Sequence, residues 1–109
     1  MLLGEVINMP RTARVKSRSG IYHIILRGIN RENIFGDDED RNRFILTMEQ
    51  CKEKCGYKIY AYCLMSNHVH ILLRENNETI SQILKRISSS YVHRYNSKYK
   101  RCGHLFQER

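Results

Sequence analysis

Residues 58–74, KIYAYCLMSNHVHILLR, decide the fold because they contain two strand-like runs joined by a short polar link. Residues 58–65 and 68–74 are rich in β-branched, aromatic and other apolar side chains, as strands are. Ser66 and Asn67, which separate the two runs, can form a tight turn. The pattern therefore predicts a β-hairpin.

Working outward from the hairpin, a third strand is expected at residues 21–28, IYHIILRG, a short apolar run bounded by glycines. A helix of about four turns should follow it, because Asp37 or Asp38 can cap its start and Gly56 can end it. Its apolar residues recur with the helical period and include two cysteines expected in the core: Phe44, Met48, Cys51 and Cys55. Met65 is expected in the core as well.

A second amphipathic helix should follow the hairpin, capped by Thr79 and ending near Asn96. Its inward face consists of apolar and aromatic residues: Ile80, Ile83, Leu84, Ile87, Tyr91 and Tyr95. Residues 104–106 could add a final edge strand. The order β-α-β-β-α, with this optional last strand, predicts an α+β, ferredoxin-like (split βαβ) sandwich, an antiparallel sheet with two helices on one face.

In that topology, strand 58–65 lies at an edge while strands 21–28 and 68–74 are central neighbours. The face of the sheet opposite the helices stays open.

The chain is basic, with 19 Lys and Arg residues against 11 Asp and Glu and a formal net charge of +8. The bases gather at the two ends, whereas the middle is acidic. Such clustering is typical of a protein that binds a polyanion, usually nucleic acid, although a solvated basic surface gives the same composition. Residues 1–20 show no hydrophobic period and are expected as a basic N-terminal arm preceding one domain, residues 21–109.

The composition also excludes several classes of protein. With 41% apolar residues the chain is too hydrophobic for a disordered tail, and 109 residues leave room for one core. No apolar run approaches the ~20 residues of a membrane span. The four cysteines form neither a CxxC pair nor a dense disulfide framework. We therefore expect a cytoplasmic protein with reduced thiols and no membrane partner.

The chemistry is expected at His68 and His70, which project from the same face of their strand because side chains alternate. Two imidazoles can bind a first-row divalent metal and leave positions open for a phosphate oxygen. A structural or merely exposed histidine pair is the alternative. His23, on the neighbouring strand, faces the pair if the strand register places it on the same face, in a supporting or core role. The acidic run 37–40 is expected to cap the first helix rather than to bind metal.

Several spaced motifs resemble the single-tyrosine HUH transposases, and most closely the REP-associated tyrosine transposases and small insertion-sequence transposases. They are Met9-Pro10-Arg11, residues 22–28 (YHIILRG), residues 62–73 (YCLMSNHVHILL), residues 96–100 (NSKYK) and residues 103–109 (GHLFQER). The resemblance runs from about Met9 to the last residue.

The resemblance implies that Mg²⁺ or Mn²⁺, held by His68 and His70, assists cleavage and rejoining of single-stranded DNA through a phosphotyrosine. Homodimers that recognise imperfect DNA hairpins are implied as well. We assign contacts with the DNA backbone to Arg27 and to the basic residues of the N-terminal arm. We expect DNA binding to depend strongly on salt. The arm residues are Arg11, Arg14, Lys16 and Arg18.

The sequence departs from the family at the nucleophile. Family members carry it in a Tyr-Ile-x-x-Asn-Pro type motif whose Asn completes the metal site, and no Tyr-x-x-x-Asn-Pro occurs within residues 1–109. We therefore expect the nucleophile beyond Arg109 and cleavage to be incomplete in this chain. Tyr91, Tyr95 and Tyr99 are less favoured internal candidates. Tyr91 continues the apolar face of its helix, which favours a core role.

Two other functions fit the same residues. A non-catalytic single-stranded nucleic-acid-binding module would use the same βαββαβ order as RNA-recognition folds, although an RNP-like aromatic run is missing. A small zinc-dependent hydrolase would need a third ligand that the sequence does not identify.

Overall fold

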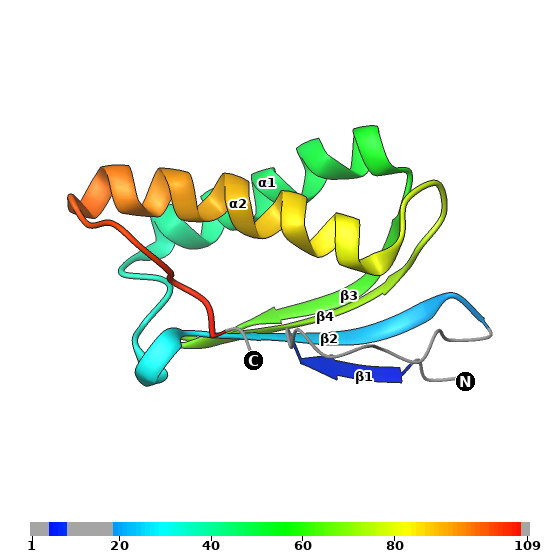
Figure 1. The fold of residues 1–109 in the computed structure, drawn as a ribbon, viewed down its shortest axis with the longest axis horizontal. Coiled ribbons are helices and arrows are strands. Elements are labelled where there is room, and N and C mark those ends of the chain that lie inside the picture. The colour runs from blue at the N-terminus through cyan, green and yellow to red at the C-terminus, as the bar shows by residue number, and fades with distance from the viewer. Residues whose placement is uncertain (1–4, 9–18, 108–109) are drawn as a thin grey trace.

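A computed structural model of the chain describes residues 5–8 and 19–107. They form one four-stranded sheet with two helices on one of its faces (Figure 1). In chain order the elements are β1 (Glu5–Asn8), β2 (Ile21–Arg27), the 3-10 helix η1 (Ile29–Arg31), α1 (Asp38–Cys55), β3 (Lys58–Leu64), β4 (His68–Arg74) and α2 (Ile80–Tyr99).

The strand order is β1-β2-β4-β3, in which β2 and β3 both pair antiparallel with β4. This arrangement confirms the α+β, split βαβ prediction, with strands 21–27 and 68–74 in the centre and β3 at an edge. The hairpin between β3 and β4 closes with a hydrogen bond from the Met65 N–H to the His68 carbonyl, 2.9 Å. Met65 is exposed at this turn rather than buried, so its expected place in the core is wrong.

One strand was not expected. β1 lies within residues 1–20, where the sequence shows no periodicity, and it pairs in parallel with β2 from Glu5 opposite Tyr22 to Asn8 opposite Ile25. Four residues are too few for an alternating pattern to stand out, and this pairing depends on a contact distant in sequence. The basic residues of the expected arm, Arg11, Arg14, Lys16 and Arg18, lie outside the described residues.

The expected final strand at residues 104–106 is reduced to an isolated antiparallel bridge between Phe106 and Gly28. The physical reason is that β1 already pairs with most of the edge of β2. Beyond β1, the C-terminal segment joins the end of β2, where the Gln107 N–H donates to the Arg27 carbonyl, 2.7 Å. Residues 105–107 thereby border the end of the sheet at which Arg27 and His68 pair.

The helices begin as predicted. The Asp37 side chain accepts from the Asp40 N–H at the start of α1, and Gly56 ends that helix with φ of 74°. Thr79 and Gln82 form a capping box at the start of α2. However, α2 runs to Tyr99, three residues beyond the predicted end at Asn96. The additional residues are held because Lys98 and Tyr99 bond to the acidic start of α1.

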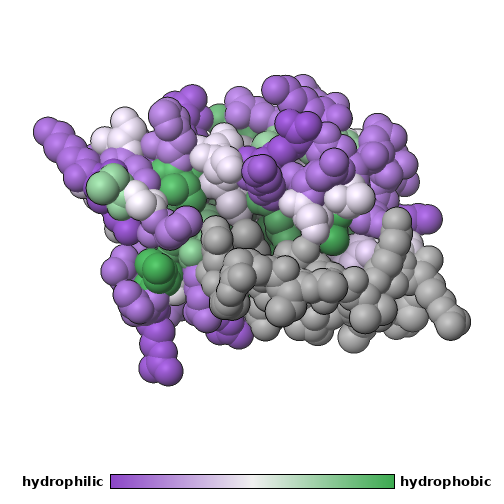
Figure 2. Space-filling model, in the orientation of Figure 1, coloured by the Kyte–Doolittle hydropathy of each residue, from purple (hydrophilic) through white to green (hydrophobic). Residues whose placement is uncertain are grey.

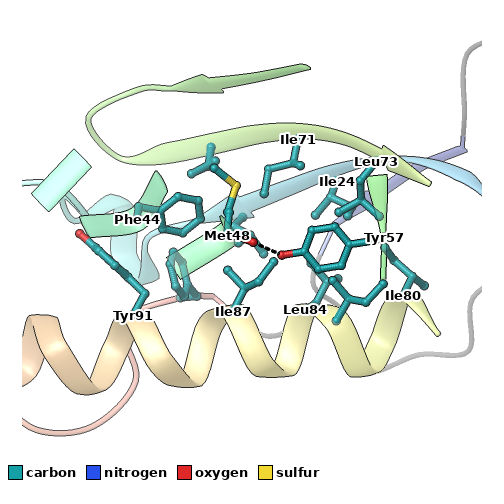
Figure 3. Packing of buried hydrophobic residues seen from close by; sticks show 14 of the residues in the cluster. Ile24, Phe44, Met48, Tyr57, Ile71, Leu73, Ile80, Leu84, Ile87 and Tyr91 are labelled. Carbon is teal, nitrogen blue, oxygen red and sulfur yellow. Dashed lines mark hydrogen bonds between the residues drawn. The ribbon is translucent and has the colours of Figure 1, made fainter. Parts of the chain in front are cut away.

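The core lies between the sheet and the helices (Figure 3). Phe44 of α1 and Tyr91 of α2 pack edge to face with ring centroids 5.1 Å apart. The buried Tyr57 hydroxyl donates to the Met48 carbonyl, which ties the start of β3 to α1. On the outside, the surface over the two helices is mostly hydrophilic (Figure 2). Most apolar side chains of the helices therefore pack against one face of the sheet.

Candidate metal centre on the open face of the sheet

The strand register brings three histidines to the face of the sheet that the helices do not cover. In β4, Val69 and Ile71 are buried in the core, so His68 and His70 project from the opposite face. In β2, His23 belongs to the same open face and lies diagonally across from His70, which pairs with Ile25. The structure thus confirms that the two predicted ligands share a face, and it places His23 beside them.

The three rings form a compact cluster. The ring centroids of His68 and His70 are 5.1 Å apart, and those of His23 and His70 are 5.2 Å apart. His23 Nε2 lies 3.0 Å from His70 Nδ1, which is hydrogen-bond distance. Of the outcomes that the sequence left open for His23, the structure selects a position in direct contact with a predicted ligand.

Asn67 determines which nitrogen of His68 is available. Its Oδ1 lies 2.8 Å from His68 Nδ1. An amide oxygen can only accept, so the neutral His68 donates from Nδ1 and carries its lone pair on Nε2. A metal ion binds the lone pair of a neutral imidazole. His68 is therefore held in a form in which Nε2 can bind one.

The turn that carries Asn67 is fixed by backbone contacts. The Gly28 N–H donates to the Asn67 carbonyl, 2.9 Å, and the Ile34 N–H donates to the Ser66 carbonyl, 2.8 Å. Any side chain at Gly28 would be driven into the backbone, because a Cβ there would lie 2.1 Å from the Glu32 carbonyl oxygen. Glycine at position 28 allows the chain after β2 to pass close to the turn and hold it in place.

The burial of His70 and the basic groups around it favour its neutral form. Burial lowers the pKa of His70, and His23, His68 and Arg27 lower it further. A lower pKa reduces competition from protons at neutral pH. The site is thus electrostatically suited to a neutral nitrogen donor.

Neutral imidazoles are suitable donors for a divalent first-row metal ion, and a harder ion would need further oxygen ligands. The described residues supply His68 and His70 with His23 beside them, but the three histidines do not form a set of donor atoms that all lie within 4.8 Å of one another. Among the described residues, the only three potential ligands whose donor atoms lie within 4.8 Å of one another are Asp37, Glu39 and Asp40. That acidic cluster is not a rival centre, because it already surrounds the Lys98 ammonium at 3.0, 2.6 and 2.9 Å.

The three internal tyrosines lie on the helical side of the sheet, away from the histidines. Tyr91 is in the core and its hydroxyl donates to the Ile34 carbonyl. The Tyr95 hydroxyl donates to the Asn33 carbonyl, 3.1 Å, and the Tyr99 hydroxyl to Asp40, 2.6 Å. All three are helical residues whose hydroxyls are engaged there. The structure does not bring any of them to the histidine pair.

Two sets of basic side chains are placed by the structure. Arg27 is exposed and pairs with His68 in the register of β2 and β4, which puts its side chain on the open face. The second set lines a groove of about 690 Å³ between the outer surfaces of α1 and α2. This groove was not predicted from the sequence. The lysine and arginine residues of this groove are Lys54, Lys85, Arg86 and Arg94, and no acidic residue among the described residues lines it. Helical period alone could assign these bases to outer faces, but not to one shared groove.

Fold and surface together define an α+β domain of the split βαβ class with a histidine cluster on its open face. Residues 16–109 match a family model described as Transposase IS200 like. The chain belongs to this family. Among curated proteins, no match to the sequence is found.

Membership confirms the family resemblance and indicates a DNA transposase function, with DNA as the partner and a divalent metal as the usual cofactor. It does not favour the alternative of a non-catalytic RNA-recognition-like module. In the part of the chain that the structure describes, neither helix is long and apolar enough to cross a membrane.

Proposed function

We propose that this transposase domain acts on single-stranded DNA and that His68 and His70 hold the divalent cation, Mg²⁺ or Mn²⁺, on which strand cleavage and rejoining depend. The observation that carries the proposal is the placement of both imidazoles on the open face, with Nε2 of His68 left free by Asn67. A cation bound there would act as a Lewis acid on the scissile phosphate.

The residues around the pair have complementary roles in this proposal. Arg27 lies beside His68 on the same face and can neutralise a DNA phosphate that approaches the imidazoles. The sequence contains four further basic residues before β2 that we assign to the DNA backbone: Arg11, Arg14, Lys16 and Arg18. The strand would be broken by a tyrosine that attacks phosphorus and releases a 3′-OH. A 5′-phosphotyrosine keeps the energy of the broken bond for rejoining.

Imperfect hairpins of single-stranded DNA are the proposed substrate. The basic groove between α1 and α2 is a second surface of suitable charge, because three of its bases, Lys54, Lys85 and Arg94, make no ion pair with the described residues. Arg86 differs, since it forms a bidentate pair with Glu78 at 2.7 Å.

We also propose that the chain works as a homodimer. β3 is an edge strand, and within the described residues its outer edge pairs with no other strand. Tyr60 and Tyr62 on this strand are about half exposed, at 50% and 47%. An edge with exposed aromatic side chains is suited to pairing with a second copy.

The four cysteines are free thiols, which supports the expected cytoplasmic location.

The test is binding of the full chain to a fluorescent single-stranded DNA hairpin, compared with a blunt duplex and an RNA hairpin of the same sequence, with and without Mn²⁺. We expect the DNA hairpin to bind most tightly and Mn²⁺ to strengthen its binding. His68→Ala should remove the effect of Mn²⁺ while leaving the metal-independent binding intact. Equal affinity for DNA and RNA hairpins, indifferent to metal, would overturn the proposal. Stoichiometric zinc in the purified protein would instead favour a zinc-dependent hydrolase.

A further inference from the structure

The contact between His23 and His70 involves two nitrogens that can share only one hydrogen between them. Each neutral imidazole has one N–H and one lone pair. At the 3.0 Å separation of His23 Nε2 and His70 Nδ1, one ring must donate and the other accept. The direction of this hydrogen bond decides which atom of His70 faces outward with a lone pair.

If His70 donates from Nδ1, its lone pair is on Nε2, the nitrogen that does not contact His23. If His23 donates instead, His70 carries its hydrogen on Nε2 and cannot offer that atom to a cation. The neighbouring ligand provides a reference, because Asn67 Oδ1 already fixes His68 with its hydrogen on Nδ1. Two histidines on one strand face present equivalent nitrogens to a shared ion only if His70 adopts the same tautomer.

We propose that His23 is a positioning residue that accepts a hydrogen bond from His70 Nδ1 and so fixes the tautomer of His70 with its lone pair on Nε2. The role of this tautomer in metal binding rests on the proposed function, whereas the hydrogen bond itself does not. His23 and Asn67 are then the equivalent acceptors behind the two imidazoles, one from the neighbouring strand and one from the hairpin turn. Partners of this kind orient metal-binding histidines in proteins generally.

The register of the sheet explains why position 23 can serve this role. His23 pairs with Leu72 and lies on the same face as His70, one diagonal step away in the ladder between β2 and β4. Tyr22 and Ile24, its neighbours in sequence, are buried in the core and anchor the strand. The ring of His23 is therefore attached to a central strand rather than to a loop, which gives it a fixed position behind His70.

The test begins with the metal-free chain, labelled with ¹⁵N in histidine and studied by long-range ¹H–¹⁵N NMR at about pH 8, above the ordinary histidine pKa of about 6.5. We expect His70 to carry its hydrogen on Nδ1. His23→Phe keeps a planar ring but removes the acceptor, so His70 should lose this preference. His23→Gln returns an acceptor oxygen and should restore it. His93 of α2 also lines the groove between the helices, and His93→Phe should leave the spectrum of His70 unchanged.

Mn²⁺ affinity, measured by the loss of the free-ion EPR signal, provides the second readout. We expect His23→Phe to weaken Mn²⁺ binding by about tenfold to 100-fold and His23→Gln to recover most of it. A wild-type His70 with its hydrogen on Nε2, or a His70 tautomer unaffected by both substitutions, would overturn the proposal. A chain that shows the expected tautomers but binds no Mn²⁺ would contradict the proposed function while supporting the role of His23 in fixing the tautomer.

Discussion

The two faces of the sheet are built from the same strands, yet they differ in nearly every property that decides function. In β4, Val69 and Ile71 face the helices and are buried, whereas His68, His70 and Leu72 face away and remain partly exposed. The covered face consists of apolar packing with buried tyrosines, and the open face gathers titratable rings. Because side chains alternate along a strand, residues that stabilise the core and residues that form the candidate site are neighbours in the sequence.

The separation predicts losses of stability of very different size for adjacent substitutions, and this is the largest effect we expect. Ile71→Ala removes a fully buried side chain from beneath the helices and should lower the free energy of unfolding by about 3 kcal/mol. Leu72→Ala, on the open face, should cost about 1 kcal/mol or less. Urea denaturation followed by circular dichroism measures both. Similar losses for the two variants would contradict the division of the faces.

The acidic cluster on the helical side should act through stability rather than through metal. Although burial alone would raise the pKa of Asp40, hydrogen bonds from Tyr99, Lys98 and the Gly36 N–H lower it. A carboxyl group with a lowered pKa stabilises the fold above its ordinary pKa, and this stabilisation is lost as the pH falls through the lowered value. Asp40→Asn should therefore cost about 2 kcal/mol near neutral pH and progressively less in acid.

Asp38→Asn is the matched control for Asp40, since Asp38 is almost fully exposed and its ion pair with Arg41 spans 3.4 Å. It should change the free energy of unfolding by less than about 0.5 kcal/mol. Denaturation at a series of pH values separates the two variants. An Asp40→Asn variant that loses Mn²⁺ affinity at unchanged stability would move the metal centre to the helical side.

Smaller effects are expected from the internal tyrosines. Tyr91→Phe removes the hydrogen bond to the Ile34 carbonyl and should cost about 1 kcal/mol. Tyr95→Phe and Tyr99→Phe should cost less, because their hydroxyls lie nearer the surface. None of the three should alter Mn²⁺ affinity. If the chain forms an SDS-resistant adduct with a labelled hairpin and Mg²⁺, an adduct lost in one variant would identify that tyrosine as the nucleophile, contrary to our expectation.

The smallest effect concerns a single charge on the open face. Arg27→Ala should weaken hairpin DNA binding a few-fold and reduce the slope of log affinity against log salt by about one, as for a single phosphate contact. Lys58→Ala is the control, because Lys58 is exposed at the opposite end of the sheet, where β3 and β4 pair through Arg74. Equal slopes for the two variants would contradict the proposed contact between Arg27 and DNA.

The sequence predicted the elements whose signals are local. Thr79 caps the start of α2 with its side chain, and Gly56 ends α1 with a left-handed backbone conformation. The hairpin follows from its two apolar runs. What it could not supply depends on contacts distant in the chain. β1 becomes a strand by pairing with β2, and α2 gains its last residues through the contact of Lys98 with the start of α1.

The site divides in the same way. His68 and His70 could be selected from one strand, because alternation alone puts them on one face. The contact of His23 with His70 required the register of β2 against β4, and a slip of one residue would have turned His23 into the core. The groove of bases between the helices required knowledge of how α1 and α2 pack.

The most direct test of the account is pulsed EPR of Mn²⁺ bound to the chain, which detects nitrogen atoms coordinated to the ion. We predict couplings from two imidazole nitrogens, one of which disappears in His68→Ala and the other in His70→Ala, while His93→Ala retains both. Mn²⁺ that shows no imidazole coupling, or that binds the His68→Ala/His70→Ala double variant as tightly as the original chain, would contradict a metal centre on the open face.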